Sequence, residues 1–146
     1  ARSIEHDPLY RDIIKNARTE PQQTSADAIA HAARTVAETL AVSAIVCYTG
    51  SGSTGLRVAR ERPDMPVIAL TPNIATGRRL AVVWGLHCMH TDDAVDLDDM
   101  VQRAVNISRD ENIAQVGDHI VITAGVPLRT PGKTNLLRVA RVTAAE

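Results

Sequence analysis

The chain is 146 residues long, carries a formal charge of −1, and draws 45% of its residues from the set AVILMFWYC but only 2% from the aromatics, with no Phe. A chain of this length is typical of one domain with its own core, which must here be aliphatic. The near balance of sixteen basic and seventeen acidic residues excludes sequence-independent electrostatic binding of nucleic acid. The lack of a long apolar run or a signal peptide favours a cytoplasmic protein with no membrane partner.

The first part of the chain is predicted to be helical. A short apolar pattern indicates a first helix, and residues 20–23 break the chain after it, so that residues 1–22 form an N-terminal helical arm. Apolar residues then recur at helical spacing from Ser25 to Leu40, which predicts a long amphipathic helix. We therefore expect residues 23–146 to form one domain to which the arm is attached.

Short apolar runs then alternate with helical segments, and such runs are typical of strands covered on both faces. Strands are predicted over residues 44–48, 67–70, 86–89 and 119–123, and the helices between them over residues 54–62, 74–83 and 97–109. Pro63 ends the first of these helices, and Asp96 is a plausible cap for the last. Cys47 and Cys88 lie in the apolar runs without a CxxC partner, which favours buried thiols in a reducing compartment over a disulfide or a metal site.

The end of the chain is expected to lie at the edge of the sheet. Residues 125–134 contain two Gly and two Pro and are predicted to be a loop, whereas apolar residues alternate with Arg over residues 135–142, as in a half-exposed strand. No helix separates this strand from the one before it, so the two should pair antiparallel. The whole pattern predicts an α/β fold: a three-layer α/β/α sandwich of about five strands, mostly parallel, with the last strand antiparallel.

The loop from Thr49 to Thr54 carries the residues that we single out for function. It follows the first predicted strand and opens a helix, and ligands of open α/β sheets bind at the carboxyl ends of strands. Its four hydroxyl groups can donate to phosphate oxygens, its glycines let backbone N–H groups approach a ligand, and the helix N-terminus adds about half a positive charge. The loop is therefore predicted to bind a phosphate; the alternative is a turn that caps its helix without a ligand.

Other ligand classes have less support. Residues 50–55 satisfy the pattern GxGxxG, but dinucleotide binding also needs an acidic residue at the end of the second strand, where this chain has residues 70–73, Leu-Thr-Pro-Asn. His87 and His90 stand three apart on a strand, which places their imidazoles on opposite faces, so no metal site is predicted. No serine, histidine and acid form a recognisable triad pattern, so no catalytic residue is predicted either.

Several motifs occur in order along the chain. They are Thr-x-Ser-Gly-x-Thr at residues 49–54, then Arg60, Arg62-Pro63, residues 66–73, Thr76, Arg78, Leu80, Trp84-Gly85, Gly117-Asp118, residues 123–125 and residues 134–139. Together they resemble the C-terminal α/β domain of pyruvate kinase, in its bacterial type. The resemblance extends from about Leu9 to Val142.

The resemblance implies a regulatory domain. In that family the Thr-x-Ser-Gly-x-Thr loop binds a phosphate of an activator such as fructose 1,6-bisphosphate, AMP or another sugar phosphate. The resemblance therefore implies that the effector phosphate is bound by Thr49, Ser51, Gly52, Ser53 and Thr54, with Arg129 and Lys133 as possible contacts to the other end of the effector. Gly50 stands where the animal form regulated by fructose bisphosphate can have lysine, and Val126 where that form can have tryptophan, so the sequence leaves the effector open.

The resemblance also implies what this chain does not do alone. In the family, transfer of phosphate from phosphoenolpyruvate to ADP takes place in a (β/α)₈ barrel that supplies the Mg²⁺ and K⁺ ligands and for which this chain is too short. We therefore expect no enzyme activity and no cofactor for the chain by itself, and a homo-oligomer or a barrel as its partner. The alternatives are an assembly module with a vestigial phosphate loop, or a nucleotide-binding enzyme.

Overall fold

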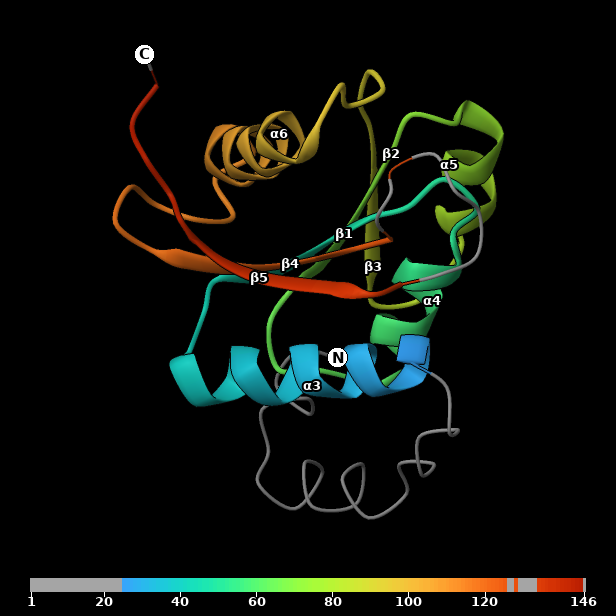
Figure 1. Cartoon of the computed structure of the whole chain (residues 1–146), viewed down its shortest axis with the longest axis horizontal. Helices are drawn as coiled ribbons and strands as arrows, with labels where there is room; N and C mark the ends of the chain where they lie inside the picture. Colours follow the sequence, from blue (N-terminus) through green and yellow to red (C-terminus); the bar gives the residue numbers. More distant parts are fainter. Residues whose placement is uncertain (1–24, 126–127, 129–133, 146) are drawn as a thin grey trace.

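The computed structural model describes residues 25–125, 128 and 134–145, which form a five-stranded sheet with helices on both faces (Figure 1). The strand order is β3-β2-β1-β4-β5. Strands β3, β2, β1 and β4 run parallel to one another, and β5 runs antiparallel to β4. The elements are α3 (Ser25–Leu40), β1 (Ala44–Tyr48), α4 (Ser53–Arg60), β2 (Val67–Thr71), α5 (Ile74–Leu80), β3 (Leu86–His90), α6 (Leu97–Asp110), β4 (His119–Ala124) and β5 (Leu136–Arg141). The predicted fold class is confirmed, whereas the predicted arm at residues 1–22 lies outside the described residues.

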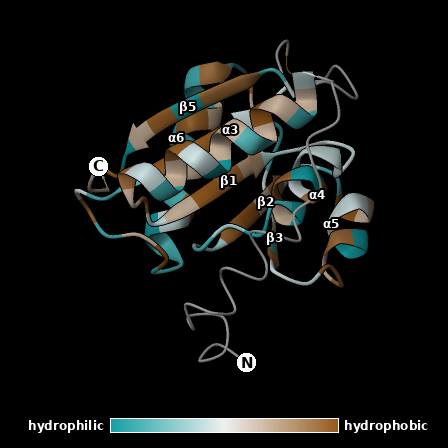
Figure 2. Ribbon diagram, turned by 90° about the horizontal axis from the view of Figure 1, so that it is seen from below, coloured by the Kyte–Doolittle hydropathy of each residue, from teal (hydrophilic) through white to brown (hydrophobic). Residues whose placement is uncertain are grey.

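The central strands β1, β2 and β4 are buried on both sides of the sheet because they carry apolar residues toward both faces. On one face, α3, α4 and Leu80 of α5 pack on the sheet residues Ile45, Cys47, Val67, Ala69 and Val121. In the view from below, α3 lies in front of the strands, and α4 and α5 lie to one side of it, next to β2 and β3 (Figure 2). The opposite face packs against α6. Every residue of β1 and β2 is buried, which explains why these strands appear in the sequence as unbroken apolar runs. No helix among the described residues is long and apolar enough to cross a bilayer.

Two helices end earlier than the sequence predicts. The expected helix over residues 54–62 ends at Arg60, because Arg62 adopts a left-handed backbone with φ of 49°. The expected helix over residues 74–83 ends at Leu80, and a tight turn follows in which the N–H of Val83 donates to the carbonyl of Leu80 at 3.0 Å. The predicted cap of the last helix is confirmed, since the Asp96 side chain accepts a backbone N–H in the first turn of α6.

Polar contacts between α3 and α4 fix how the two helices lie against each other. Glu61, which follows α4, accepts from Arg34 Nε at 3.3 Å, and its carboxylate oxygen lies 2.9 Å from His31 Nδ1. Arg57 of α4 donates to Asp27 of α3 at 2.6 Å. Partly buried ion pairs such as these are screened by salt less than exposed ones. They help to hold α4 in place, and α4 begins directly after the loop singled out above.

The two cysteines occupy different environments. Burial raises the pKa of the Cys47 thiol, in the central strand β1, to about 12. Cys88 lies in the edge strand β3 and is only partly covered, although burial raises its pKa as well. Both thiols are free. The prediction of a buried thiol is therefore confirmed for Cys47, whereas Cys88 is partly exposed.

Candidate functional site

The loop between β1 and α4 lies where the strand order of the sheet changes direction. From β1 the chain moves outward to β2 and β3 on one side and then returns to β4 on the other side of β1. The carboxyl ends of β1 and β4 are therefore neighbours, as the pairing of Cys47 with Thr123 shows. In open α/β sheets a crevice at such a switch point is where ligands bind. The loop predicted from sequence begins at this point.

A glycine with left-handed backbone geometry shapes the loop. Gly52 has φ of 95°, which L side chains rarely adopt, and its N–H donates to Thr49 Oγ1 at 2.8 Å. A Cβ at this position would lie 3.2 Å from a methyl carbon of Leu80 and 3.4 Å from the methyl of Thr76. The loop thus folds closely onto α5, and both Gly52 and the buried Thr49 serve to hold that fold.

Two serines are the hydroxyl groups of the loop that remain accessible. Ser51 is exposed and Ser53 is half-buried, and their Oγ atoms lie 3.1 Å apart. Ser51 Oγ also accepts the backbone N–H of Ser53 at a long 3.4 Å. Both hydroxyls therefore face one another at the start of α4, where each can donate a hydrogen bond to the same acceptor.

Apart from the long contact between the Ser53 N–H and Ser51 Oγ, the first turn of α4 has no side-chain cap. Side chains of Asn73 and Asp96 cap α5 and α6, but α4 follows Gly52 and has no acidic residue in its first turn. The N–H groups of Thr54 and Gly55 have no hydrogen-bond acceptor among the described residues. The positive end of the helix dipole is left without a countercharge here, and such an end favours an anion.

Thr54 has a partner that its place in the sequence does not suggest. Its hydroxyl lies 2.6 Å from that of Thr134, and both side chains are buried. This contact joins the start of α4 to the segment that leads into β5, 80 positions further along the chain. The Thr54 side chain is thus engaged within the protein, and its backbone N–H is the group that remains for a ligand.

Helix α5 holds the loop from the other side; the helix itself was predicted from the sequence, but its contacts with the loop were not. Thr76 Oγ1 donates to the carbonyl of Gly50 at 2.7 Å, and Arg79 Nη2 donates to the carbonyl of Ser51 at 3.1 Å. Thr76 is among the motif residues, but nothing in its pattern indicated contact with the loop, and Arg79 lies 28 positions from Ser51. Neither contact could be expected before the position of α5 was known.

The remaining predicted contacts cannot be placed. Arg129, Lys133 and Val126 lie outside the described residues, so their part in the site stays a prediction. Within the part of the chain that the structure describes, no three His, Cys, Asp or Glu side chains gather where they could hold a metal ion.

The fold and the loop place the chain in the class of open α/β domains that present a hydroxyl-rich loop at the switch point of the sheet. Its family follows from comparison with known proteins. Residues 27–140 match the family described as pyruvate kinase, alpha/beta domain. The chain belongs to this family.

Pyruvate kinases of several bacteria are similar to the chain over most of its length. The pyruvate kinase of Methylorubrum extorquens strain AM1 is 48% identical over 143 residues, which cover 98% of this chain and 30% of that protein. The pyruvate kinase of Geobacillus stearothermophilus is 42% identical over 130 residues, which cover 89% and 22%, and one from Agrobacterium vitis is 36% identical over 137 residues, which cover 94% and 28%. The chain thus spans less than a third of the length of these relatives.

Proposed function

We propose that the chain is the regulatory domain of a pyruvate kinase and binds a phosphorylated metabolite at the loop from Thr49 to Thr54. The observation that carries the proposal is the uncapped N-terminus of α4, with the accessible hydroxyls of Ser51 and Ser53 beside it at the switch point. A phosphate monoester supplies the acceptor oxygens and the negative charge that this position lacks. AMP and sugar phosphates share that group, and the rest of the ligand decides between them.

Each loop residue has a distinct part in the proposed site. Ser51 and Ser53 donate their hydroxyls to phosphate oxygens, and the free N–H groups at the start of α4 donate as well. Thr49 and Gly52 hold the loop conformation through the bond between the Gly52 N–H and Thr49 Oγ1. Thr54 ties the site to Thr134, next to the segment that carries Arg129 and Lys133.

Phosphate binding can be tested by thermal unfolding of the chain with ribose 5-phosphate, AMP, glucose 6-phosphate, fructose 1,6-bisphosphate and inorganic phosphate. A ligand at 100 times its Kd stabilises the folded state by about 2.7 kcal/mol, which raises Tm by several degrees. Ser51→Ala should remove most of this shift, because it deletes an accessible donor. Thr143→Ala, which deletes an exposed hydroxyl far along the chain, should keep it in full. No shift with any of these compounds at millimolar concentration would count against the proposal.

The chemistry of the intact enzyme is proposed to lie outside this chain. The relatives named as pyruvate kinases are more than three times as long, so the residues that transfer phosphate from phosphoenolpyruvate to ADP, and those that hold Mg²⁺ and K⁺, would belong to the remaining part of such a protein. This domain would then act on the reaction through its ligand and its contacts with that part.

Assembly into a homo-oligomer is the second part of the proposal. Among the described residues, strand β5 pairs with β4 only, and Val139 on it is 39% exposed, so the strand offers an edge to a second copy. Light scattering during size-exclusion chromatography should give a mass above the 15.7 kDa of one chain. Val139→Lys should lower this mass. A monomer at every concentration would contradict this part, whereas an oligomer without any phosphate-induced shift would favour an assembly module with a vestigial loop.

A further inference from the structure

Arg79 is the one charged side chain among the described residues that bonds to the loop. Its Nη2 donates to the carbonyl of Ser51 at 3.1 Å and to Thr76 Oγ1 at 3.2 Å. Thr76 Oγ1 in turn donates to the carbonyl of Gly50 at 2.7 Å. One hydrogen-bonded chain from Arg79 therefore holds two consecutive carbonyl groups of the loop against α5.

The direction of these carbonyls matters for an anion. In a planar trans peptide the C=O and N–H groups point in opposite directions. Holding the carbonyls of Gly50 and Ser51 toward α5 thus turns the N–H groups of Ser51 and Gly52 away from α5. The negative ends of these two peptide dipoles are kept on the α5 side, where they are bound to donors. Two bonds fix the peptide between Ser51 and Gly52: the one from Arg79 to the Ser51 carbonyl, and the one from the Gly52 N–H to Thr49 Oγ1 at 2.8 Å. Without Arg79 only the second remains, the Ser51 carbonyl is held less firmly, and a carbonyl turned outward would repel a phosphate.

Arg79 also brings a charge that the loop does not have. Residues 49–54 include no ionisable side chain. The guanidinium has five N–H donors, and only Nη2 has bonds among the described residues, so Nε and Nη1 can donate elsewhere. Arg79 is exposed, so it can reach a ligand without burying its charge.

We propose that Arg79 is the positioning residue of the phosphate loop and the source of its positive charge, so that the site selects the dianionic form of a phosphate monoester. This inference rests on the proposed function, since it assigns a residue and a charge preference to the same site. Arg78, the neighbouring exposed arginine of α5, makes no side-chain hydrogen bond to the loop among the described residues and serves as the matched control.

The charge preference can be tested with ribose 5-phosphate, whose second ionisation lies near pH 6. Calorimetric titration at pH 5 and pH 7.5 should give much tighter binding at the higher pH for the unmodified chain and for Arg78→Ala. Arg79→Ala should weaken binding at pH 7.5 by tenfold or more and flatten the dependence on pH. Arg79→Lys should restore the dependence on pH, because it restores the charge, but not the full affinity, because an ammonium lacks the planar fork.

The positioning role has a readout that needs no ligand. In the free chain, Arg79→Ala should shift the amide NMR signals of Ser51 and Gly52, whereas Arg78→Ala should leave them in place. Unchanged signals in Arg79→Ala, or binding within twofold of the unmodified chain with the same dependence on pH, would overturn the inference. If the unmodified chain binds no phosphate compound at all, the proposed function and the charge preference fail together, and the amide signals still decide whether Arg79 positions the loop.

Discussion

Gly52→Ala is expected to lower the free energy of unfolding by about 1–3 kcal/mol and to remove phosphate binding. The backbone of Gly52 has φ of 95°, and a Cβ there would lie 3.2 Å from a methyl carbon of Leu80, which is itself buried in the core. An alanine must therefore either accept the strained backbone or move the loop. A moved loop loses the bond from the Gly52 N–H to Thr49 and the alignment of the serines with α4.

Gly50→Ala provides the matched comparison. Apart from its chain neighbours, no described residue would have an atom within 4 Å of the added Cβ, and the φ of Gly50 does not lie in the left-handed region. We expect a stability within about 0.5 kcal/mol of the unmodified chain and unchanged binding of ribose 5-phosphate. Urea unfolding gives the stabilities and calorimetric titration gives the affinities. Equal losses in the two variants would mean that the conformation at Gly52 is not what the site depends on.

The sequence predicts the sheet well because its strands are buried on both faces. The strands around residues 44–48 and 67–70 are unbroken apolar runs, which are typical of strands inside a sandwich. The position of the loop followed from the same pattern, since a loop after a strand in an α/β sheet lies at a carboxyl end. The prediction that the last strand is antiparallel followed from the missing helix before it, and the pairing of β4 with β5 confirms it.

What the sequence cannot predict are contacts that depend on the order of strands and on single backbone angles. The alternation of strands and helices does not say that β4 lies beside β1, so the bond between Thr54 and Thr134 could not be expected. The contact of Arg79 with Ser51 depends in the same way on where α5 packs. The early end of α4 depends on the left-handed φ of Arg62, a residue that rarely adopts it.

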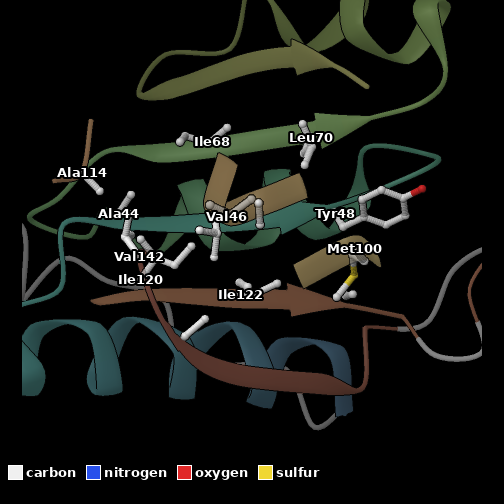
Figure 3. Packing of buried hydrophobic residues seen from close by; sticks show 14 of the residues in the cluster. Ala44, Val46, Tyr48, Ile68, Leu70, Met100, Ala114, Ile120, Ile122 and Val142 are labelled. Carbon is white, nitrogen blue, oxygen red and sulfur yellow. The ribbon is translucent and has the colours of Figure 1, made fainter. Parts of the chain in front are cut away.

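Ile122→Ala should have the largest effect on stability, with a loss of about 2–5 kcal/mol. Ile122 is fully buried in β4, in register with Val46 of β1, which is itself in register with Ile68 of β2. These three side chains form a row across the centre of the sheet, on the face that α6 covers (Figure 3). The sheet around the row is rigid, so a truncated side chain leaves a cavity that its neighbours cannot fill.

Val139→Ala is the control for position in the sheet. Val139 lies on the adjoining edge strand β5 and is 39% exposed. Its truncation should therefore lower the free energy of unfolding, measured with urea, by well under half as much as Ile122→Ala does. A loss in Ile122→Ala no larger than that in Val139→Ala would contradict the description of the core.

The same variant separates stability from binding. A domain of this kind is stable by about 5–15 kcal/mol, so Ile122→Ala should stay folded at low temperature. Its side chain lies on the α6 face, whereas the loop is held by α5 and by α4, which pack on the opposite face. We therefore expect the affinity for ribose 5-phosphate to stay within twofold of the unmodified chain while Tm falls. Gly52→Ala should instead lose more affinity than its loss of stability explains. The two variants together therefore distinguish a site that depends on the local geometry of the loop from one that depends only on the overall stability of the fold.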